Sequence, residues 1–255
     1  MRILVTNDDG IGAPGLVVAE AIAAELAGPS GEVWVVAPEA ERSGASHAIT
    51  YTQPSRLTRL GERRFSVDGY PADCALVGMH KLLCETPPDL VISGVNRGHN
   101  VAEDVVYSGT VGAAMEAALG GARAIALSQF YAKDGPEDLF GASKALGLSV
   151  VERVLTMPFP PGVFYNVNFP AVTPERVKGV AVCPQGLRAD ATFEVVDYLG
   201  PNGREYQFLR HRTSNASADE GSDARMCLDG WVAITPLRAQ LTATDVLDGA
   251  RAALG

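Results

Sequence analysis

Short apolar runs that alternate with segments of helical period are the feature that most constrains the fold of this chain. A run at Ile3 to Thr6 precedes a helical segment at Leu16 to Leu26, and a second run follows at Val33 to Ala37. The runs are too continuous for strands with one face in water, so they predict parallel strands covered on both faces. The same alternation continues with a helix at Ala72 to Leu83, a strand at Leu90 to Ser93, a helix at Thr110 to Leu119 and a strand at Ala124 to Ser128.

This alternation indicates an α/β fold, with a Rossmann-like, doubly wound, mostly parallel sheet in a three-layer α/β/α arrangement. An amphipathic segment at Asp138 to Leu155 completes this part, and the prolines within 157–161 end it. Ligands of such sheets bind at the carboxyl ends of the strands. The loops that follow the strands are therefore the candidate site.

After Pro161 the pattern becomes richer in β-structure. Strands are expected at Phe164 to Phe169, Val177 to Cys183, Thr192 to Tyr198, Tyr206 to Arg210 and Trp231 to Thr235, and a helix at Ala243 to Ala253. Gly200 to Gly203 predicts a hairpin turn, and Ser214 to Arg225 a mobile loop. These strands either form a small separate domain or extend the first sheet and project an arm toward another subunit. We expect one domain over 1–255, with a core at 1–160 and a β-rich extension at 161–255.

Charge and composition narrow the classes of function. The chain has 21 basic and 30 acidic residues among 255, a net charge of −9, so it offers no broad basic face for duplex nucleic acid. Small anionic ligands are compatible with that charge. The four cysteines show no CxxC spacing, and no segment approaches the roughly 20 apolar residues that span a bilayer. The first apolar run is also too short for a signal peptide. These features predict a soluble cytoplasmic protein that does not contact membranes.

Two adjacent carboxylates, Asp8 and Asp9, directly follow the first predicted strand. Neighbouring negative charges repel, and a hard divalent cation that accepts oxygen ligands removes the repulsion. The plainer alternative is that one carboxylate caps the next helix and the other lies in water, since Asp-Gly often only makes a turn. The position at the carboxyl end of a strand favours a metal site.

Two later loops carry further polar groups. Asn96 and Asn100 lie in a glycine-spaced loop after the strand at Leu90 to Ser93, and amide oxygens suit a hard metal ion. The small residues within Arg42 to His47 let backbone amides approach a ligand, although such runs are more often ordinary turns. His47 itself is more often a structural hydrogen-bonding residue than a base.

Ser108, Gly109 and Thr110 stand at the start of a predicted helix. Hydroxyls, free amides and the positive end of the helix there favour an anion, although a plain helix cap is the alternative. Because all these strand-end loops would meet at one crevice, we expect a single site that binds a cation and an anion.

The sequence also resembles the SurE family of survival-protein nucleotidases. Each block of the resemblance is common, but together they are specific, and they are ordered along nearly the whole chain: Asn7-Asp8-Asp9-Gly10 with Ala13-Pro14-Gly15, Val36-Ala37-Pro38, Arg42-Ser43-Gly44, Pro71-Ala72-Asp73-Cys74, Ser93-Gly94-Val95-Asn96, Tyr107-Ser108-Gly109-Thr110-Val111, Asn166-Val167-Asn168-Phe169-Pro170 and Thr235-Pro236-Leu237.

The resemblance implies one divalent cation per subunit, Mg²⁺ or Mn²⁺, held by Asp8, Asp9, Ser43 and Asn96. It implies that the loop at Ser108, Gly109 and Thr110 receives the phosphate. It further implies hydrolysis of nucleoside 5′- and 3′-monophosphates, with exopolyphosphatase activity in some members. A homodimer or homotetramer built by exchange of C-terminal segments is implied as well.

We therefore expect a metal-dependent phosphatase, a 5′-nucleotidase, in which Asp8 and Asp9 are the catalytic residues and Asn100 is a further contact of the substrate. The sequence leaves open whether water or the Asp8 carboxylate attacks phosphorus. Water is favoured because the metal needs both carboxylates.

Three other classes fit less well. A phosphoacceptor receiver would need an acceptor Asp after its third strand and a later Lys. A dinucleotide-binding module would bring a pyrophosphate against two carboxylates. A haloacid-dehalogenase-like phosphatase needs an Asp-x-Asp motif, which the adjacent pair does not supply.

Overall fold

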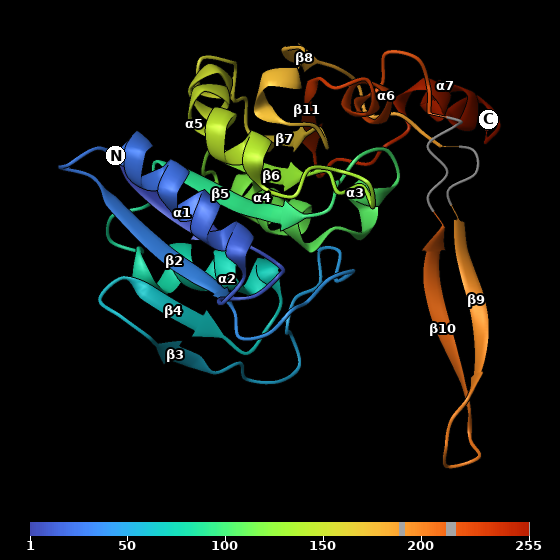
Figure 1. Ribbon diagram of the computed structural model, residues 1–255, viewed down its shortest axis with the longest axis horizontal. Coiled ribbons are helices and arrows are strands. Elements are labelled where there is room, and N and C mark those ends of the chain that lie inside the picture. Colours follow the sequence, from blue (N-terminus) through green and yellow to red (C-terminus); the bar gives the residue numbers. More distant parts are fainter. Residues whose placement is uncertain (189–191, 213–217, 255) are drawn as a thin grey trace.

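The computed structural model describes residues 1–188, 192–212 and 218–254, and its centre is a nine-stranded sheet in the order β3-β4-β2-β1-β5-β6-β7-β11-β8 (Figure 1). The strands are β1 (Arg2–Thr6), β2 (Glu32–Pro38), β3 (Leu57–Arg59), β4 (Arg64–Val67), β5 (Leu90–Arg97), β6 (Ala124–Gln129), β7 (Val163–Phe169), β8 (Val180–Val182) and β11 (Val232–Arg238). Strands β4, β2, β1, β5, β6 and β7 run parallel. At the two ends, β3 is antiparallel to β4, and β11 is antiparallel to β7 and parallel to β8.

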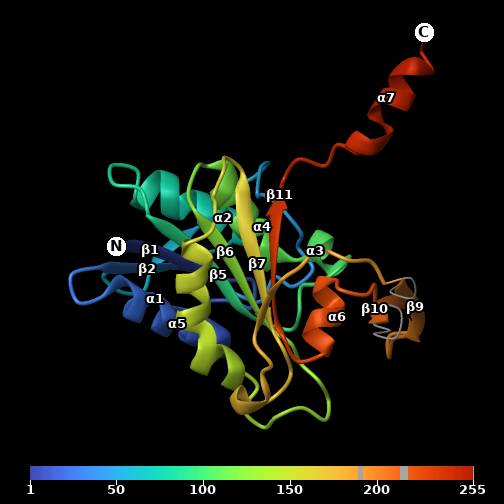
Figure 2. The same ribbon diagram turned by 90° about the horizontal axis from the view of Figure 1, so that it is seen from above.

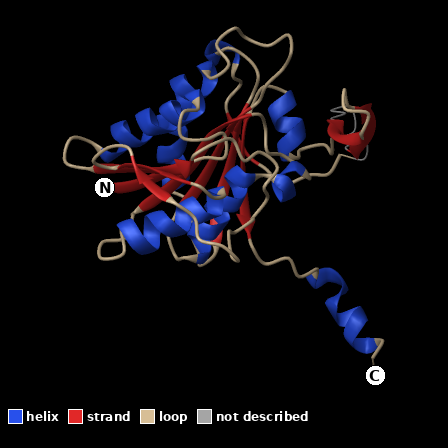
Figure 3. Cartoon of the chain, turned by 90° about the horizontal axis from the view of Figure 1, so that it is seen from below, coloured by secondary structure: helices blue, strands red, loops and turns tan. Residues whose placement is uncertain are grey.

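Four helices cover the two faces of the sheet. Helices α1 (Pro14–Ala27) and α5 (Gly141–Leu155) lie on one face, and α2 (Pro71–Val77) and α4 (Gly109–Leu119) lie on the other (Figure 3). Along β1, Ile3 and Val5 pack into the core on the α1 side while Leu4 packs into the core on the α2 side. This two-residue period is that of a strand with both faces buried, as the apolar runs predict.

Two segments leave the main body. Strands β9 (Thr192–Leu199) and β10 (Glu205–Arg212) pair with each other in an antiparallel hairpin outside the large sheet, and helix α7 (Thr244–Ala252) extends away from the body at the C-terminal end (Figure 2). Helix α7 buries none of its residues.

The remaining short elements lie beside the sheet. They are a π-helical turn that continues α2 (Gly78–Leu82), helix α3 (Asp104–Tyr107), a 3₁₀ turn (Pro174–Arg176) and helix α6 (Asp223–Leu228). None of the described helices is both long and apolar enough to span a bilayer.

The predicted fold class is confirmed. Of the two arrangements left open for the C-terminal half, the strands extend the first sheet through β7, β11 and β8, and the β9–β10 hairpin projects from it. The elements that were not predicted are β3, β4, α3, the 3₁₀ turn and α6. Strands β3 and β4 are only three and four residues long, and α3 has four residues, which is too few for either hydrophobic period to show. The loop predicted at Ser214 to Arg225 lies partly outside the described residues, and its end belongs to α6.

Candidate active site

The loops after β1 and β5 emerge side by side because the two strands are paired in parallel, with Thr6 opposite Ser93. At this carboxyl edge of the sheet lies a cavity of about 450 Å³. Its lining includes five of the residues predicted for the site: Asp8, Ser43, Asn96, Asn100 and Ser108. The strands and the start of α4 thus gather groups that are far apart in the sequence.

Asp8 is buried at this edge. Thr110 Oγ1 donates a hydrogen bond to Asp8 Oδ1 at 2.5 Å. Burial raises the pKa of Asp8 to about 6; the hydrogen bond from Thr110 opposes the shift, and the neighbouring charge of Asp9 adds to it. An ionised Asp8 is therefore costly here, and a cation placed beside it would offset the cost.

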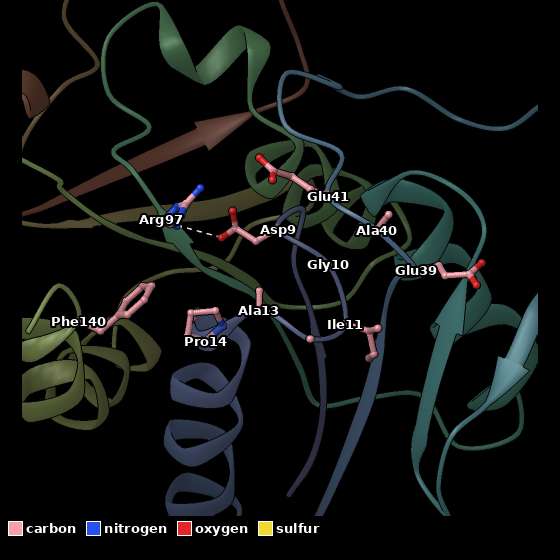
Figure 4. A pocket seen from close by; sticks show the side chains of 12 residues that line it. Asp9, Gly10, Ile11, Ala13, Pro14, Glu39, Ala40, Glu41, Arg97 and Phe140 are labelled. Carbon is pink, nitrogen blue, oxygen red and sulfur yellow. Dashed lines mark hydrogen bonds between the residues drawn. The ribbon is translucent and has the colours of Figure 1, made fainter.

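Asp9 lines a second hollow of about 260 Å³, where Figure 4 shows its carboxylate beside Arg97. The backbone amide of Arg97 donates to Asp9 Oδ2 at 3.0 Å, which leaves Oδ1 for another ligand. Burial raises the pKa of Asp9, while the Arg97 amide and the charge of Arg97 oppose the shift. Arg97 lines both hollows, so the two carboxylates stand on either side of one shared wall.

A bulge in β5 sets the position of Asn96. The pairing of β5 with β6 shifts register between Ser93 and Asn96, and a bulge re-aims the side chains that follow it. Gly94 at the bulge has φ +131°, and a Cβ there would lie 2.1 Å from the Leu127 carbonyl oxygen, so the position requires glycine. Asn96 Nδ2 donates to the Gly98 carbonyl at 3.0 Å, which fixes the amide and leaves Oδ1 available to a ligand.

The loop after β2 brings Ser43 to the cavity. The Arg42 amide donates to the Asp8 carbonyl at 2.7 Å, and this bond holds the loop against the end of β1. Ser43 Oγ donates to Glu41 Oε1 at 2.8 Å, so the lone pairs of the Ser43 hydroxyl oxygen point away from Glu41. His47 Nε2 lies 2.6 Å from Glu116 Oε2 on α4, which agrees with a structural role.

The start of α4 lies directly against Asp8. Ser108 Oγ accepts a hydrogen bond from the Val111 amide at 3.1 Å and so caps the helix. A Cβ at Gly109 would lie 3.0 Å from Asp8 Cβ, so the absence of a side chain permits this close approach. The Ser108 hydroxyl thus caps the helix, and the Thr110 hydroxyl binds Asp8. The backbone amides of the first helical turn are the groups suited to bind an anion.

Asn100 is held rigidly by the neighbouring strands. Its Nδ2 donates to Ser128 Oγ at 2.7 Å, and its backbone amide donates to Asn168 Oδ1 at 2.8 Å. Its carbonyl accepts hydrogen bonds from the side-chain amides of Asn166 and Asn168. The asparagines of β7 therefore position the loop that carries Asn100.

The donors at this edge fit a hard cation. The described part of the chain contains no group of three or more His, Cys, Asp and Glu side chains that could hold a metal ion, and neither Asp8 nor Asp9 forms a salt bridge within it. Two carboxylates, an amide oxygen and a hydroxyl are nevertheless the ligands of Mg²⁺, which keeps several waters. Asn7 Oδ1 and Ser93 Oγ are also buried there without a hydrogen-bond partner among the described residues.

The sequence reasoning missed a buried cation, Arg188, that contacts two residues of the cavity lining, His99 and Asp104. The Arg188 side chain is fully buried, and it pairs with Glu103 Oε1 at 2.6 Å and with Asp104 Oδ1 at 2.7 Å. Its Nη1 lies 3.2 Å from His99 Nε2. Burial acts to lower the pKa of Arg188, but the two carboxylates more than offset this and raise it.

Asp223 ties the same region together from α6. It accepts hydrogen bonds from the backbone amides of Ala102 and Gly186 at 3.0 Å each. These contacts join positions 121 and 37 residues apart, and no local pattern in the sequence marks them.

Sheet and cavity together define a doubly wound α/β protein whose ligand crevice lies at the carboxyl edge of the sheet, between paired carboxylates and a helix N-terminus. Comparison with known families shows which family within this class the chain belongs to. The chain belongs to the SurE family, whose model, described as "Survival protein SurE", matches residues 3–192.

Similarity to individual proteins covers the whole chain. The chain is 50% identical over 260 residues to "5'-nucleotidase SurE" of Ruegeria pomeroyi, with all of both chains covered. It is 48% identical over 253 residues to the protein of the same name from Roseobacter denitrificans, with 97% of each covered. Among solved structures it resembles the SurE protein from Aquifex aeolicus, with a TM-score of 0.83, 35% identity and complete coverage of both chains.

Proposed function

We propose that this protein is a phosphoric monoester hydrolase that converts nucleoside 5′-monophosphates to nucleoside and phosphate. The observation that carries the proposal is the buried Asp8 carboxylate in contact with the N-terminal turn of α4, at a cavity large enough for a nucleotide. The relatives named 5'-nucleotidase SurE support the same substrate class. Hydrolysis of 3′-monophosphates and of polyphosphate ends is part of the proposal.

The proposed cofactor is one Mg²⁺ or Mn²⁺ per subunit, held by Asp8, Asp9, Ser43 and Asn96. When bound, such a cation neutralises the charge that develops on the phosphoryl oxygens and activates water. The chain's own part is to fix the oxygen ligands: the Arg97 amide orients Asp9, the Gly98 carbonyl orients the Asn96 amide, and Thr110 orients Asp8.

The phosphate is proposed to sit on the first turn of α4. The Ser108 amide already donates to the Asp104 carbonyl, so the backbone amides of Gly109 and Thr110 then donate to the phosphate oxygens. The helix end stabilises the charge that increases in the transition state. Asn100, fixed by Ser128, lines the same cavity and contacts the substrate. Attack by water forms a bond from its oxygen to phosphorus and breaks the bond to the nucleoside oxygen, which leaves with a proton given up by the water. In this step Asp8 and Asp9 would act as ligands of the cation and not as nucleophiles.

Assembly into a homodimer or homotetramer through the C-terminal segments is also proposed. It is supported by the exposed apolar side chains of the β9–β10 hairpin and by α7, which buries nothing against its own chain. A cytoplasmic location stays a prediction.

A phosphate-release assay tests the function. Wild-type protein should release phosphate from AMP with Mg²⁺ or Mn²⁺ and lose that activity in excess chelator, and added metal should restore it. A panel of 5′- and 3′-monophosphates, polyphosphate and simple phosphoesters defines the substrate range. Absence of release from every nucleotide with metal present would contradict the proposal.

A further inference from the structure

Two aromatic rings line the cavity beside the proposed phosphate site. Tyr107 is the last residue of α3 and directly precedes Ser108, and Phe193 is in β9. Their ring centroids are 5.1 Å apart and the rings meet edge to face, at 83°. Tyr107 is 45% exposed and Phe193 is 46% exposed. A cavity of otherwise polar and charged character therefore has one aromatic wall whose side chains are partly exposed.

The backbone that carries Tyr107 is fixed from two sides. The Ser46 amide donates to the Tyr107 carbonyl at 2.9 Å, and Ser46 Oγ donates to the Val106 carbonyl at 2.7 Å. From the other side, the fully buried Arg188 binds Glu103 and Asp104 at the start of α3. The proposed phosphate site and Tyr107 thus belong to one rigid unit, so a ligand that uses both loses little entropy in ordering this part of the protein.

A substrate that places its phosphate on α4 must place the rest of its structure along this cavity. An aromatic wall favours a flat, aromatic group by stacking and by edge-to-face contact. In a nucleoside monophosphate that group is the base, which the sugar separates from the phosphate. Stacking on protein aromatic rings tolerates every base, because each base has a π-face.

We propose that Tyr107 and Phe193 form a nucleobase-stacking subsite that accepts purines and pyrimidines and favours the larger purine face. The inference rests on the proposed function, in which the α4 turn binds the phosphate. The subsite explains how one polar cavity selects nucleotides over other phosphomonoesters. It also gives the hairpin a part in substrate selection.

The test compares AMP with ribose 5-phosphate, which carries the same sugar and phosphate without a base. The measured quantity is the ratio of kcat/KM for AMP to kcat/KM for ribose 5-phosphate. The wild-type ratio should be well above one. Phe193→Ala and Tyr107→Ala should each lower it by about 5- to 100-fold, mainly through KM for AMP, as expected when one stacked base loses its partner. Phe193→Trp should keep a ratio near that of the wild type.

Phe208→Ala is the matched control, because Phe208 is 52% exposed on the same hairpin and does not line the cavity. Its ratio should equal that of the wild type. The loss in the two test variants should be smaller for CMP than for AMP. Because each result is a ratio of two substrates on one protein, partial unfolding of a variant does not imitate the effect.

Binding without turnover separates the subsite from the reaction. Asp8→Asn with Mg²⁺ should bind AMP more tightly than ribose 5-phosphate in calorimetric titrations, and adding Phe193→Ala should reduce that difference. A wild-type ratio near one, or ratios unchanged in both alanine variants, would overturn the subsite and leave the nucleotidase standing. Failure of wild-type protein to hydrolyse either compound would instead overturn the proposed function, and the titrations would still decide the subsite.

Discussion

The crevice buries a carboxylate and the projecting hairpin exposes apolar side chains, so the two regions depart in opposite ways from the usual distribution of side chains. At the crevice, Asp8 is buried without a salt bridge within the described residues. On the hairpin, Val195 is 62% exposed and Leu209, directly opposite it in the register, is 71% exposed. A buried carboxylate and an exposed apolar pair are each unfavourable for a single chain in water.

The difference matches the two kinds of partner proposed above. A cation would offset the cost of the buried carboxylate, which supports the proposed metal site in the crevice. A second protein surface would remove the exposed apolar pair from water, which supports the proposed assembly through the hairpin. The four predictions below separate these two explanations.

The largest expected effect follows from removing the charge of Asp8. Asp8→Asn keeps the side-chain size, and turnover of AMP should fall by roughly 10³-fold or more because a charge-stabilising element is lost. Phosphate release with saturating Mg²⁺ measures it. Asp197→Asn on the hairpin should leave turnover unchanged. An Asp8→Asn protein with full activity would show that the crevice is not the site of chemistry.

The free energy of unfolding should show how much burial of the Asp8 carboxylate destabilises the folded protein. With a pKa near 6 against 3.8 ordinarily, the folded protein keeps a proton that the unfolded chain releases in this range. Stability of the metal-free protein should therefore fall as pH rises from about 4 to 6, by up to about 3 kcal/mol from this group.

Urea denaturation in chelator, compared between wild type and Asp8→Asn, isolates that contribution. The variant should be the more stable protein at about pH 8, and the difference should vanish below about pH 4. Added Mg²⁺ should stabilise the wild type and have little effect on the variant. A wild type that is more stable than Asp8→Asn in chelator at about pH 8 would contradict the assigned cost.

A smaller effect is expected from Thr110→Val, which keeps the branched shape and removes the hydroxyl that donates to Asp8. Losing one hydrogen bond to a charged group should lower kcat/KM by roughly 10-fold, and it should weaken cation binding because Asp8 is less well oriented. Calorimetry with Mn²⁺ and steady-state kinetics measure the two effects. Thr235→Val, a buried threonine of β11, is the control. Cation affinity equal to that of the wild type would assign Thr110 to the phosphate instead.

The smallest change is in assembly. Sedimentation should show a dimer or larger for wild-type protein, and Val195→Glu combined with Leu209→Glu should reduce the mass about twofold if the hairpin lies in an interface. Val17→Glu, at a 61% exposed position on α1, should leave the mass unchanged. A wild-type protein that sediments as a monomer would leave the exposed pair without its proposed partner.

The sequence predicts most of the fold because the apolar runs of β1, β2, β5 and β6 are long enough to show their burial. Five of the predicted site residues do meet at the cavity, since parallel strands bring their carboxyl ends to one edge, whereas Asp9 lines the neighbouring hollow. The sequence did not predict the contacts of Arg188. Arg188 is a single charged residue between the strands predicted at Val177 to Cys183 and at Thr192 to Tyr198. Its partners Glu103 and Asp104 lie about 85 positions away, at the start of the four-residue helix α3. The bond from Thr110 to Asp8 was missed for the same reason, as 102 positions separate the two residues.

Strand β8 has a consequence for the order in which the molecule is made. In the described sheet it pairs with β11 alone, and β11 comes about fifty residues later in the chain. A ribosome adds about 5–20 residues per second, so β8 spends seconds outside the exit tunnel as an unmatched edge. During that interval the growing polypeptide presents the free edge of β7 as well, to which β11 must dock. Newly made chains crowded on one messenger RNA therefore have these two strand edges open to neighbouring chains until β11 has docked.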